Sequence, residues 1–243
     1  MYAVILAAGR GTRFFPHSKH TPKPLAKILS RPIIEYTIQA LRKAGVKNII
    51  IVIGHLGRLI KEHLGDGDKF GVKIQYCYNR HYALENATSL KAAEKKIPSD
   101  KPFLLLMGDH YFDEQIIEFV LNNAGYYPLL CVDRKPCYPP QIKDATRVLL
   151  NDSGYVIDIG KNIPVWNAID TGLFILDNTI FRVIHFLEGV KTNLTVTDCI
   201  KYLTLNVRPV LGFNISGYLW FDIDTPQDIE FINSLLMRFT GCQ

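Results

Sequence analysis

Two glycines and an arginine follow the first apolar segment of this chain, as Gly9, Gly11 and Arg13. A strand that ends in small residues and glycines leaves backbone N–H groups exposed, and successive N–H groups form a concave site for anions. The guanidinium of Arg13 adds a charged fork that suits a polyphosphate. The spacing therefore predicts a phosphate-binding loop directly after a strand.

This loop differs from two common phosphate-binding patterns. It lacks the GxxxxGK[ST] order of a P-loop, and Phe14 takes the place of the third glycine of a GxGxxG fingerprint. The acidic residue that a dinucleotide site needs about 20 positions further on is also missing. On these residues alone, a plain glycine turn remains an alternative.

Lys23 lies between Pro22 and Pro24, shortly after the loop. The two prolines restrict the backbone on both sides, which predicts a stiff, extended segment. A lysine held near a phosphate loop can neutralise charge on a phosphoryl group that is being transferred. The alternative is a surface lysine in a proline turn.

An acidic residue, Asp109, follows the apolar run 103–107 and Gly108. Ligands bind outside the carboxyl ends of strands in open α/β sheets, and Mg²⁺ prefers oxygen ligands. We therefore expect Asp109 to hold a metal ion, with a helix N-cap as the alternative. The neighbouring His110 is either a hydrogen-bond partner of this site or a catalytic residue.

A second acidic pair, Asp222 and Asp224, stands on either side of Ile223. In an extended segment, this alternation places both carboxylates on one side. Asp224 either shares a metal-binding role or caps the helix expected to start at Thr225 and Pro226. Asp228 is expected to be an acidic residue in the first turn of that helix.

The elements that must position these residues alternate along the first part of the chain. Short apolar runs predict strands buried on both faces, at 2–7, 48–53, 72–76, 103–107 and 128–132. Helical patterns occupy 32–44, 56–64, 87–96, 113–123 and 226–238. The alternation predicts an α/β fold with a doubly wound, mostly parallel, Rossmann-like sheet.

The second half of the chain is more mixed. Extended or hairpin segments are expected at 146–150, 155–159, 168–176 and 207–219. No linker, repeat or low-complexity stretch interrupts the chain, so a single domain over residues 1–243 is expected.

Composition excludes several classes of protein. A content of 48% hydrophobic and 21% charged residues excludes a disordered chain. The net charge of +5 is spread without a basic block, so no nucleic-acid partner is expected. The 5 cysteines are scattered and form no CxxC pair, which favours reduced thiols and a cytoplasmic protein. No signal peptide and no membrane span are expected, because the apolar runs are shorter than the ~20 residues of a span.

The segment LAAGRGTRFFPHSKHTPKPLAKI strongly resembles the signature of the nucleotidyltransferases that join a nucleoside triphosphate to a sugar or polyol phosphate. The resemblance includes the glycine loop, Arg13 and Lys23, and it extends over most of the chain. It implies that Arg13 and Lys23 are catalytic. The nucleotide-binding residues that it implies are Leu6, Ala7, Ala8, Gly9, Gly11, Thr12, Arg13, Lys23, Gly108 and, from the nucleobase segment 79–90, Asn86, Ala87 and Thr88.

The same resemblance assigns further residues to the site. It implies that Asp109 holds the metal ion, Mg²⁺. A W-x-D-x-x-T pattern supplies Asp222 as the second ligand, and whether Asp224 shares this metal-binding role stays open. Acceptor binding is implied for Lys161, Asp170 and Thr171.

The implied reaction is attack by the acceptor's phosphate oxygen on the α-phosphorus of the nucleotide, with release of pyrophosphate. Both reactants are anions, so the site must neutralise charge and align the groups in line. A phosphate monoester needs no general base at neutral pH, and no covalent nucleophile is required.

The motifs most resemble the CTP-using branch of this family, which includes inositol-1-phosphate and phosphocholine cytidylyltransferases. We expect CTP and inositol 1-phosphate as substrates, in phospholipid biosynthesis. Hexose-1-phosphate nucleotidyltransferases that use dTTP, UTP or GTP are the main alternative, and a non-catalytic nucleotide-sensing subunit is a remote one. Some inositol cytidylyltransferases carry a fused membrane-embedded transferase. For this protein, we expect that second transferase activity to reside elsewhere. A homodimer remains one option, although the apolar face of 226–238 is more simply explained by core packing.

Overall fold

The computed structural model describes residues 1–14, 19–99, 101–126 and 128–240, and a nine-stranded sheet is the central feature of this part. Its strands follow the order β10-β9-β11-β6-β1-β4-β5. Strand β8 pairs with β11, and β12 pairs with β8. The sheet therefore joins the N-terminal strands to the C-terminal ones through the β6–β11 pair.

Four parallel strands form the N-terminal half of the sheet, as predicted. They are β1 (Tyr2–Ala7), β4 (Asn48–Ile53), β5 (Lys73–Tyr78) and β6 (Phe103–Met107). In β1, which lies between β4 and β6, Leu6 is in register with Val52 on one side and with Met107 on the other. The carboxyl ends of β1 and β6 thus lie side by side, each followed by residues of the predicted site.

The C-terminal half of the sheet is largely antiparallel. Strand β11 (Ala168–Leu176) pairs in antiparallel fashion with β6, β8 (Leu129–Asp133) and β9 (Arg147–Leu150). Strand β10 (Val156–Gly160) pairs with β9. Together with the parallel half, this confirms the predicted α/β sheet with a mixed second half.

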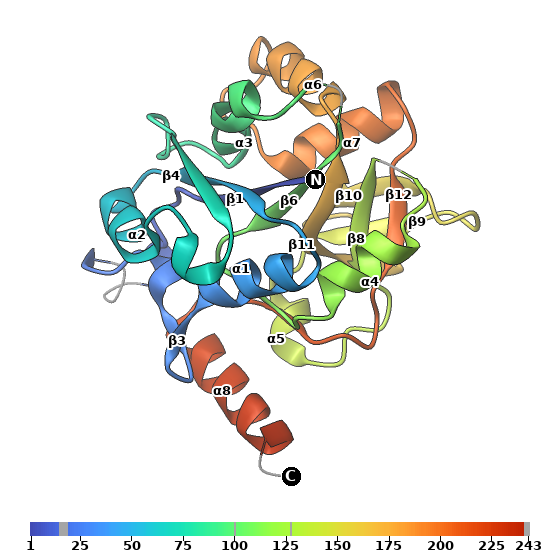
Figure 1. Ribbon diagram of the computed structural model, residues 1–243. Helices are drawn as coiled ribbons and strands as arrows, with labels where there is room; N and C mark the ends of the chain where they lie inside the picture. Colours follow the sequence, from blue (N-terminus) through green and yellow to red (C-terminus); the bar gives the residue numbers. More distant parts are fainter. Residues whose placement is uncertain (15–18, 100, 127, 241–243) are drawn as a thin grey trace.

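Helices cover both faces of the sheet (Figure 1). One face carries α1 (Ile33–Lys43), α2 (Gly57–Leu64) and α4 (Ile116–Asn123). The other carries α3 (Ala87–Ala93), α6 (Thr179–Glu188) and α7 (Val196–Asn206). Among the described residues, no helix is both long and apolar enough to cross a lipid bilayer.

Three details correct the sequence predictions. Helices α6 and α7 were not expected, although both bury apolar residues on one face. The segment 207–219 is not a hairpin: only β12 (Leu211–Asn214) is a strand, and it pairs in parallel with β8. The helix expected at 87–96 is α3 followed by a 3₁₀ turn, η5 (Glu94–Lys96).

Smaller elements complete the fold. Strands β7 (His110–Phe112) and β13 (Trp220–Asp222) form an antiparallel pair, and β2 (Lys27–Ile28) pairs with β3 (Arg31–Pro32). The remaining helices are α5 (Pro139–Lys143), α8 (Pro226–Thr240) and the 3₁₀ turns η1 (Thr12–Phe14), η3 (Lys23–Leu25) and η4 (Asp68–Phe70). Helix α8 extends away from the sheet toward the C-terminus (Figure 1).

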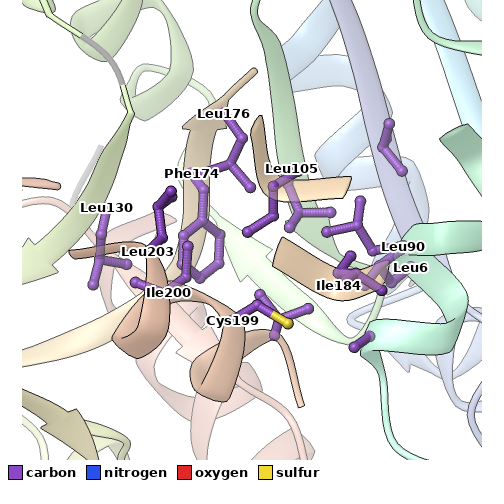
Figure 2. Packing of buried hydrophobic residues seen from close by; sticks show 14 of the residues in the cluster. Leu6, Leu90, Leu105, Leu130, Phe174, Leu176, Ile184, Cys199, Ile200 and Leu203 are labelled. Carbon is purple, nitrogen blue, oxygen red and sulfur yellow. The ribbon is translucent and has the colours of Figure 1, made fainter. Parts of the chain in front are cut away.

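The core on the α6–α7 side packs these helices against the central strands. Figure 2 shows Phe174 of the sheet beside Leu203 of α7, with Leu105 in the same cluster. The rings of Phe103 and Phe181 stack with centroids 5.8 Å apart. Because such interiors are close-packed, the strands and the helices that border the site hold their relative positions.

Candidate active site

The loops after β1 and β6 touch because a glycine follows β6. The N–H of Gly108 donates to the carbonyl of Leu6 at 2.9 Å, and a Cβ atom on residue 108 would lie 2.8 Å from that oxygen. No other residue fits this approach without displacing the backbone. The contact brings Asp109, the next residue, beside the glycine loop.

The glycine loop forms a small pocket of about 180 Å³. Gly11 has a φ of +59°, a conformation that favours glycine. The pocket is lined by Leu6, Ala7, Gly9, Gly11, Thr12, Arg13, Lys23, Pro24, Asp109 and Asp224. The structure therefore brings together most of the residues predicted to bind nucleotide.

Apart from the nucleobase segment, the predicted nucleotide-binding residues that do not line this pocket are Ala8 and Gly108. Ala8 is buried, and its carbonyl accepts a hydrogen bond from the N–H of His55 at 3.0 Å. Gly108 instead holds the start of the loop through the hydrogen bond from its N–H to the carbonyl of Leu6.

Lys23 is buried, and its ammonium group lies among carboxylates. Its Nζ is 2.8 Å from Oδ2 of Asp109, 2.7 Å from Oδ1 of Asp224 and 4.0 Å from Oδ1 of Asp222. Burial alone would lower the pKa of Lys23, but the three carboxylates outweigh burial and raise it well above its usual value. Lys23 is therefore a fixed positive charge in this site.

The backbone around Lys23 differs from the expected extended segment. Residues Lys23–Leu25 form a 3₁₀ turn, in which the N–H of Ala26 donates to the carbonyl of Lys23 at 2.9 Å. Pro22 before the turn and Ala26 after it have an extended backbone. The two prolines thus flank a turn in which the lysine side chain is buried.

Arg13 contacts the same carboxylate as Lys23. One of its guanidinium nitrogens lies 2.5 Å from Oδ2 of Asp224 and 3.8 Å from Oδ2 of Asp144. Asp224 thus binds Lys23 through one oxygen and Arg13 through the other. The two predicted catalytic cations are linked by a single carboxylate.

The β7–β13 pair places Asp222 opposite His110. The Nδ1 atom of His110 lies 3.1 Å from Oδ1 of Asp109 and 3.6 Å from Oδ1 of Asp222. One ligand atom from each of these three residues falls within a 4.8 Å group. Among the described residues, the buried Oδ1 of Asp222 accepts no hydrogen bond.

This trio is suited to a metal ion. Two carboxylates and one imidazole are common ligand types, and the oxygen of Asp222 that accepts no hydrogen bond is a natural donor to a cation. Asp224 is not a member of the group.

Burial and charge act in opposite directions on the titration of these groups. Burial raises the pKa of Asp222 to about 6, although His110 opposes the shift. Burial lowers the pKa of His110, but Asp222 and Asp109 outweigh burial and raise it to about 9. Burial raises the pKa of Asp109, whereas Lys23 and His110 hold it well below its usual range.

The N-terminus of α8 is capped by Asp228 and Thr225. Oδ2 of Asp228 accepts from the N–H groups of Thr225 and Asp224, at 2.7 Å and 3.0 Å. The alternative that Asp224 caps this helix is therefore wrong, because its carboxylate faces the two cations instead. Asp228 lies in the first turn of α8, as predicted.

A larger cleft of about 760 Å³ adjoins the loop pocket. Arg13, Asp109 and Asp224 line both spaces, so the two meet at these residues. The cleft also contains Asn86, Lys161 and Asp170. A site with two compartments joined at charged residues can hold two substrates with their reacting groups adjacent.

The residues predicted to bind the acceptor do not all reach the cleft. Lys161 and Asp170 line it, and Oδ1 of Asp170 accepts from the N–H of Gly172 at 2.7 Å. Burial raises the pKa of Asp170 to about 6. Thr171 is fully buried on the other side of the strand, where its hydroxyl donates to the carbonyl of Cys131 at 2.9 Å.

In the segment 79–90, only Asn86 of the three predicted residues lines the cleft. Its Oδ1 accepts from the N–H of Val196 at 2.8 Å. Ala87 belongs to the buried core, and the hydroxyl of Thr88 donates to the carbonyl of Glu85 at 2.9 Å.

Sequence reasoning missed Asn79, which is buried and organises this segment. Its Nδ2 donates to the hydroxyls of Thr88 and Ser89 at 3.0 Å and 2.9 Å, and its Oδ1 accepts from the N–H of His81 at 2.8 Å. Its position directly after the strand Lys73–Tyr78 is the sequence feature that could have identified it.

Sequence reasoning also missed Gln141 of α5, which lines the cleft. Its side chain donates to the carbonyl of Trp220 at 2.8 Å and so supports the strand that carries Asp222. No local pattern marks this residue, because its partner is far along the chain.

The sequence is similar to a known protein family and to several curated proteins. A family model described as Nucleotidyl transferase matches residues 2–132. A curated protein from Aquifex aeolicus named Bifunctional IPC transferase and DIPP synthase is 32% identical over 241 residues, covering 97% of this chain and 52% of the relative. A protein of the same name from Thermococcus kodakarensis is 33% identical, covering 97% of this chain and 50% of the relative. This chain thus spans about half the length of these curated relatives.

Among solved structures, the inositol-1-phosphate CTP transferase from T. maritima has a similar fold. The TM-score is 0.84 at 23% sequence identity, and the match covers 97% of this chain and 96% of that one.

Proposed function

This chain belongs to the nucleotidyl transferase family, and we propose that it transfers a cytidylyl group from CTP to inositol 1-phosphate, giving CDP-inositol and pyrophosphate. One observation carries the proposal. The glycine-loop pocket and the larger cleft meet at Arg13, Asp109 and Asp224, with Lys23 buried at the junction.

The residues of the junction suit a reaction between two anions. An oxygen of the acceptor phosphate forms a bond to the α-phosphorus while the bond from that phosphorus to the pyrophosphate oxygen breaks. Arg13 and Lys23 offset the negative charge of the two reactants, and the glycine loop holds the triphosphate in line. The phosphate nucleophile is already ionised, so no residue has to remove a proton from it.

A magnesium ion fits the same junction. Asp109 and Asp222 would hold it, since their oxygens are hard ligands and Oδ1 of Asp222 accepts no hydrogen bond from the described residues. When bound, the ion would neutralise charge on the phosphates. His110 would orient the two carboxylates through Nδ1.

The choice of substrates is supported by the relatives and by the cleft. The structural relative of similar fold is named an inositol-1-phosphate CTP transferase. In the cleft, Asp170 can accept hydrogen bonds from polyol hydroxyls, and Lys161 can contact the acceptor phosphate. The segment around Asn86 is proposed to contact the base.

A pyrophosphate-release assay with Mg²⁺ tests the proposal. CTP, UTP, GTP and dTTP are each paired with inositol 1-phosphate, phosphocholine and glucose 1-phosphate, and the nucleotide product is identified by mass. CTP with inositol 1-phosphate should give the highest kcat/KM. A hexose 1-phosphate as the best acceptor would reject the substrate choice, and no turnover with any pair would reject the enzyme function in favour of a nucleotide-sensing subunit.

A further inference from the structure

We propose that Asp224 is a positioning residue: it holds Arg13 and Lys23 in the orientation that receives the nucleotide phosphates, and it does not bind the metal. This inference rests on the proposed function, because it assigns the two cations to the triphosphate. It separates the roles of two acidic residues, Asp222 at the end of β13 and Asp224 two positions later, before α8.

The geometry of Asp224 is that of a bridge between cations. Its Oδ1 lies 2.7 Å from Nζ of Lys23, and its Oδ2 lies 2.5 Å from the guanidinium of Arg13. Both oxygens are therefore engaged by the two positive groups that line the glycine-loop pocket. Such charge-assisted contacts fix the direction of long, flexible side chains.

The environment of Asp224 also differs from that of the metal-binding group. Its side chain is 12% exposed, compared with 34% for Asp109 and 41% for Asp222. The group formed by Asp109, His110 and Asp222 does not include it. Each oxygen of Asp224 already contacts a cationic side chain, whereas Asp222 has an oxygen that accepts no hydrogen bond from the described residues.

This arrangement has a consequence for nucleotide binding. The carboxylate of Asp224 occupies the same cations that the triphosphate needs, so it competes with the phosphates in the ground state. It also restricts the motion of Arg13 and Lys23, which favours a precise arrangement in the transition state. Removing its charge should therefore strengthen nucleotide binding and slow the chemical step.

The experiment compares wild type, Asp224→Asn and Asp222→Asn. Asp222→Asn is the matched control, because it also removes one negative charge close to Lys23, at 4.0 Å. Three quantities are measured: CTP affinity by calorimetry with a chelator present, affinity for Mn²⁺ alone, and steady-state kcat and KM for CTP with Mg²⁺. Thermal unfolding of each protein shows whether it is folded.

We expect Asp224→Asn to bind CTP about tenfold more tightly without metal, a gain of about 1.4 kcal/mol. Its Mn²⁺ affinity should remain within about twofold of wild type, and both kcat and KM for CTP should fall. Asp222→Asn should instead lose at least about tenfold in Mn²⁺ affinity.

Three results with an active wild type would overturn the inference alone. They are a loss of Mn²⁺ affinity in Asp224→Asn equal to that in Asp222→Asn, an equal gain in CTP affinity in both variants, and unchanged kcat and KM with a lower Tm. A wild type that neither binds nor turns over any triphosphate would reject the proposed function itself, and this inference with it.

Discussion

The backbone of Gly172 lies directly against the imidazole of His110. A Cβ atom on residue 172 would stand 2.7 Å from Nε2 of His110, and Gly172 has a φ of +74°. On its other side, the same ring contacts Asp109 and Asp222 through Nδ1. A glycine in β11 thus sets the position of the ring that lies between the two proposed metal ligands.

Gly172→Ala should therefore damage both stability and metal binding. The positive φ alone costs about 1 kcal/mol, and displacement of the His110 ring adds at least as much. We expect a lower Tm and weaker Mn²⁺ binding in calorimetry.

Gly154→Ala is the control for Gly172→Ala, since Gly154 has a φ of +83° but its Cβ would meet nothing closer than 3.7 Å. It should lose stability from backbone strain only and bind Mn²⁺ normally. Equal Mn²⁺ affinity in both variants would contradict the role given to this contact.

Lys23→Met should strongly reduce turnover and lower stability. The substitution removes the cation that contacts Asp109 and Asp224 and leaves these carboxylates without it. Loss of one partner from a buried charge cluster costs about 3–5 kcal/mol. Loss of one group that stabilises the transition state reduces kcat by about 10²–10³-fold.

Pyrophosphate release and urea unfolding check the effects of Lys23→Met. The exposed Lys27 offers a matched control, because Lys27→Met removes a lysine four positions away without touching the site. Activity of Lys23→Met near that of Lys27→Met would show that Lys23 is not required.

Asp198 should make stability depend on pH through the cap of α7. Its Oδ2 accepts from the N–H and hydroxyl of Thr195 at 2.9 Å and 2.6 Å, and Lys191 lies 2.7 Å away. Burial raises the pKa of Asp198, but these partners outweigh burial and lower it in the folded protein. Stability from this group is therefore present above its unfolded pKa of about 3.9 and is lost as pH falls through the folded value.

We expect Asp198→Asn to lower the free energy of unfolding by about 1 kcal/mol at pH 7, the usual cost of a lost cap. The difference from wild type should shrink below about pH 4. Urea titrations between pH 3 and pH 7 measure this, with the exposed Asp152→Asn as control. A constant difference across the range would contradict the cap assignment.

Leu203→Ala tests the packing of α7 against the sheet. Leu203 is 1% exposed and packs in the cluster with Phe174, whereas Leu205 in the same helix is 56% exposed. The buried substitution should cost about 2–5 kcal/mol, and Leu205→Ala should change stability by less than about 0.5 kcal/mol. Chemical denaturation measures the free energy of unfolding of the two variants. A similar loss of stability in both would contradict the packing of α7 against the sheet through Leu203.

Local sequence was sufficient for the parts of the fold that depend on short-range pattern. The strand at 2–7, the glycine loop and Asp109 all follow from an apolar run and the residues that end it. Helix α7 was missed, since Val196 and other β-branched residues obscure its helical preference. Its stability comes from the Thr195–Asp198 cap and from tertiary packing of Ile200 and Leu203.

Features that depend on distant partners could not be predicted in the same way. Strand β12 pairs in parallel with β8, which lies about 80 residues earlier, so no local signal separates it from a hairpin. Alternation correctly suggested that Asp222 and Asp224 lie near one site. It could not show that one faces His110 and the other faces Arg13 and Lys23, because these partners come from other strands and loops.

The hydrogen bond from the N–H of Val196 to Oδ1 of Asn86 joins two segments that line the cleft. Together with the bond from the N–H of Ala87 to the carbonyl of Leu194, it ties the segment proposed to contact the base to the start of α7, where Thr197 also lines the cleft. Any ordering that one ligand imposes on one of these two segments therefore also restrains the other segment, because the hydrogen bonds connect them. Linkage is reciprocal, so the factor by which a nucleotide changes acceptor affinity must equal the factor by which the acceptor changes nucleotide affinity.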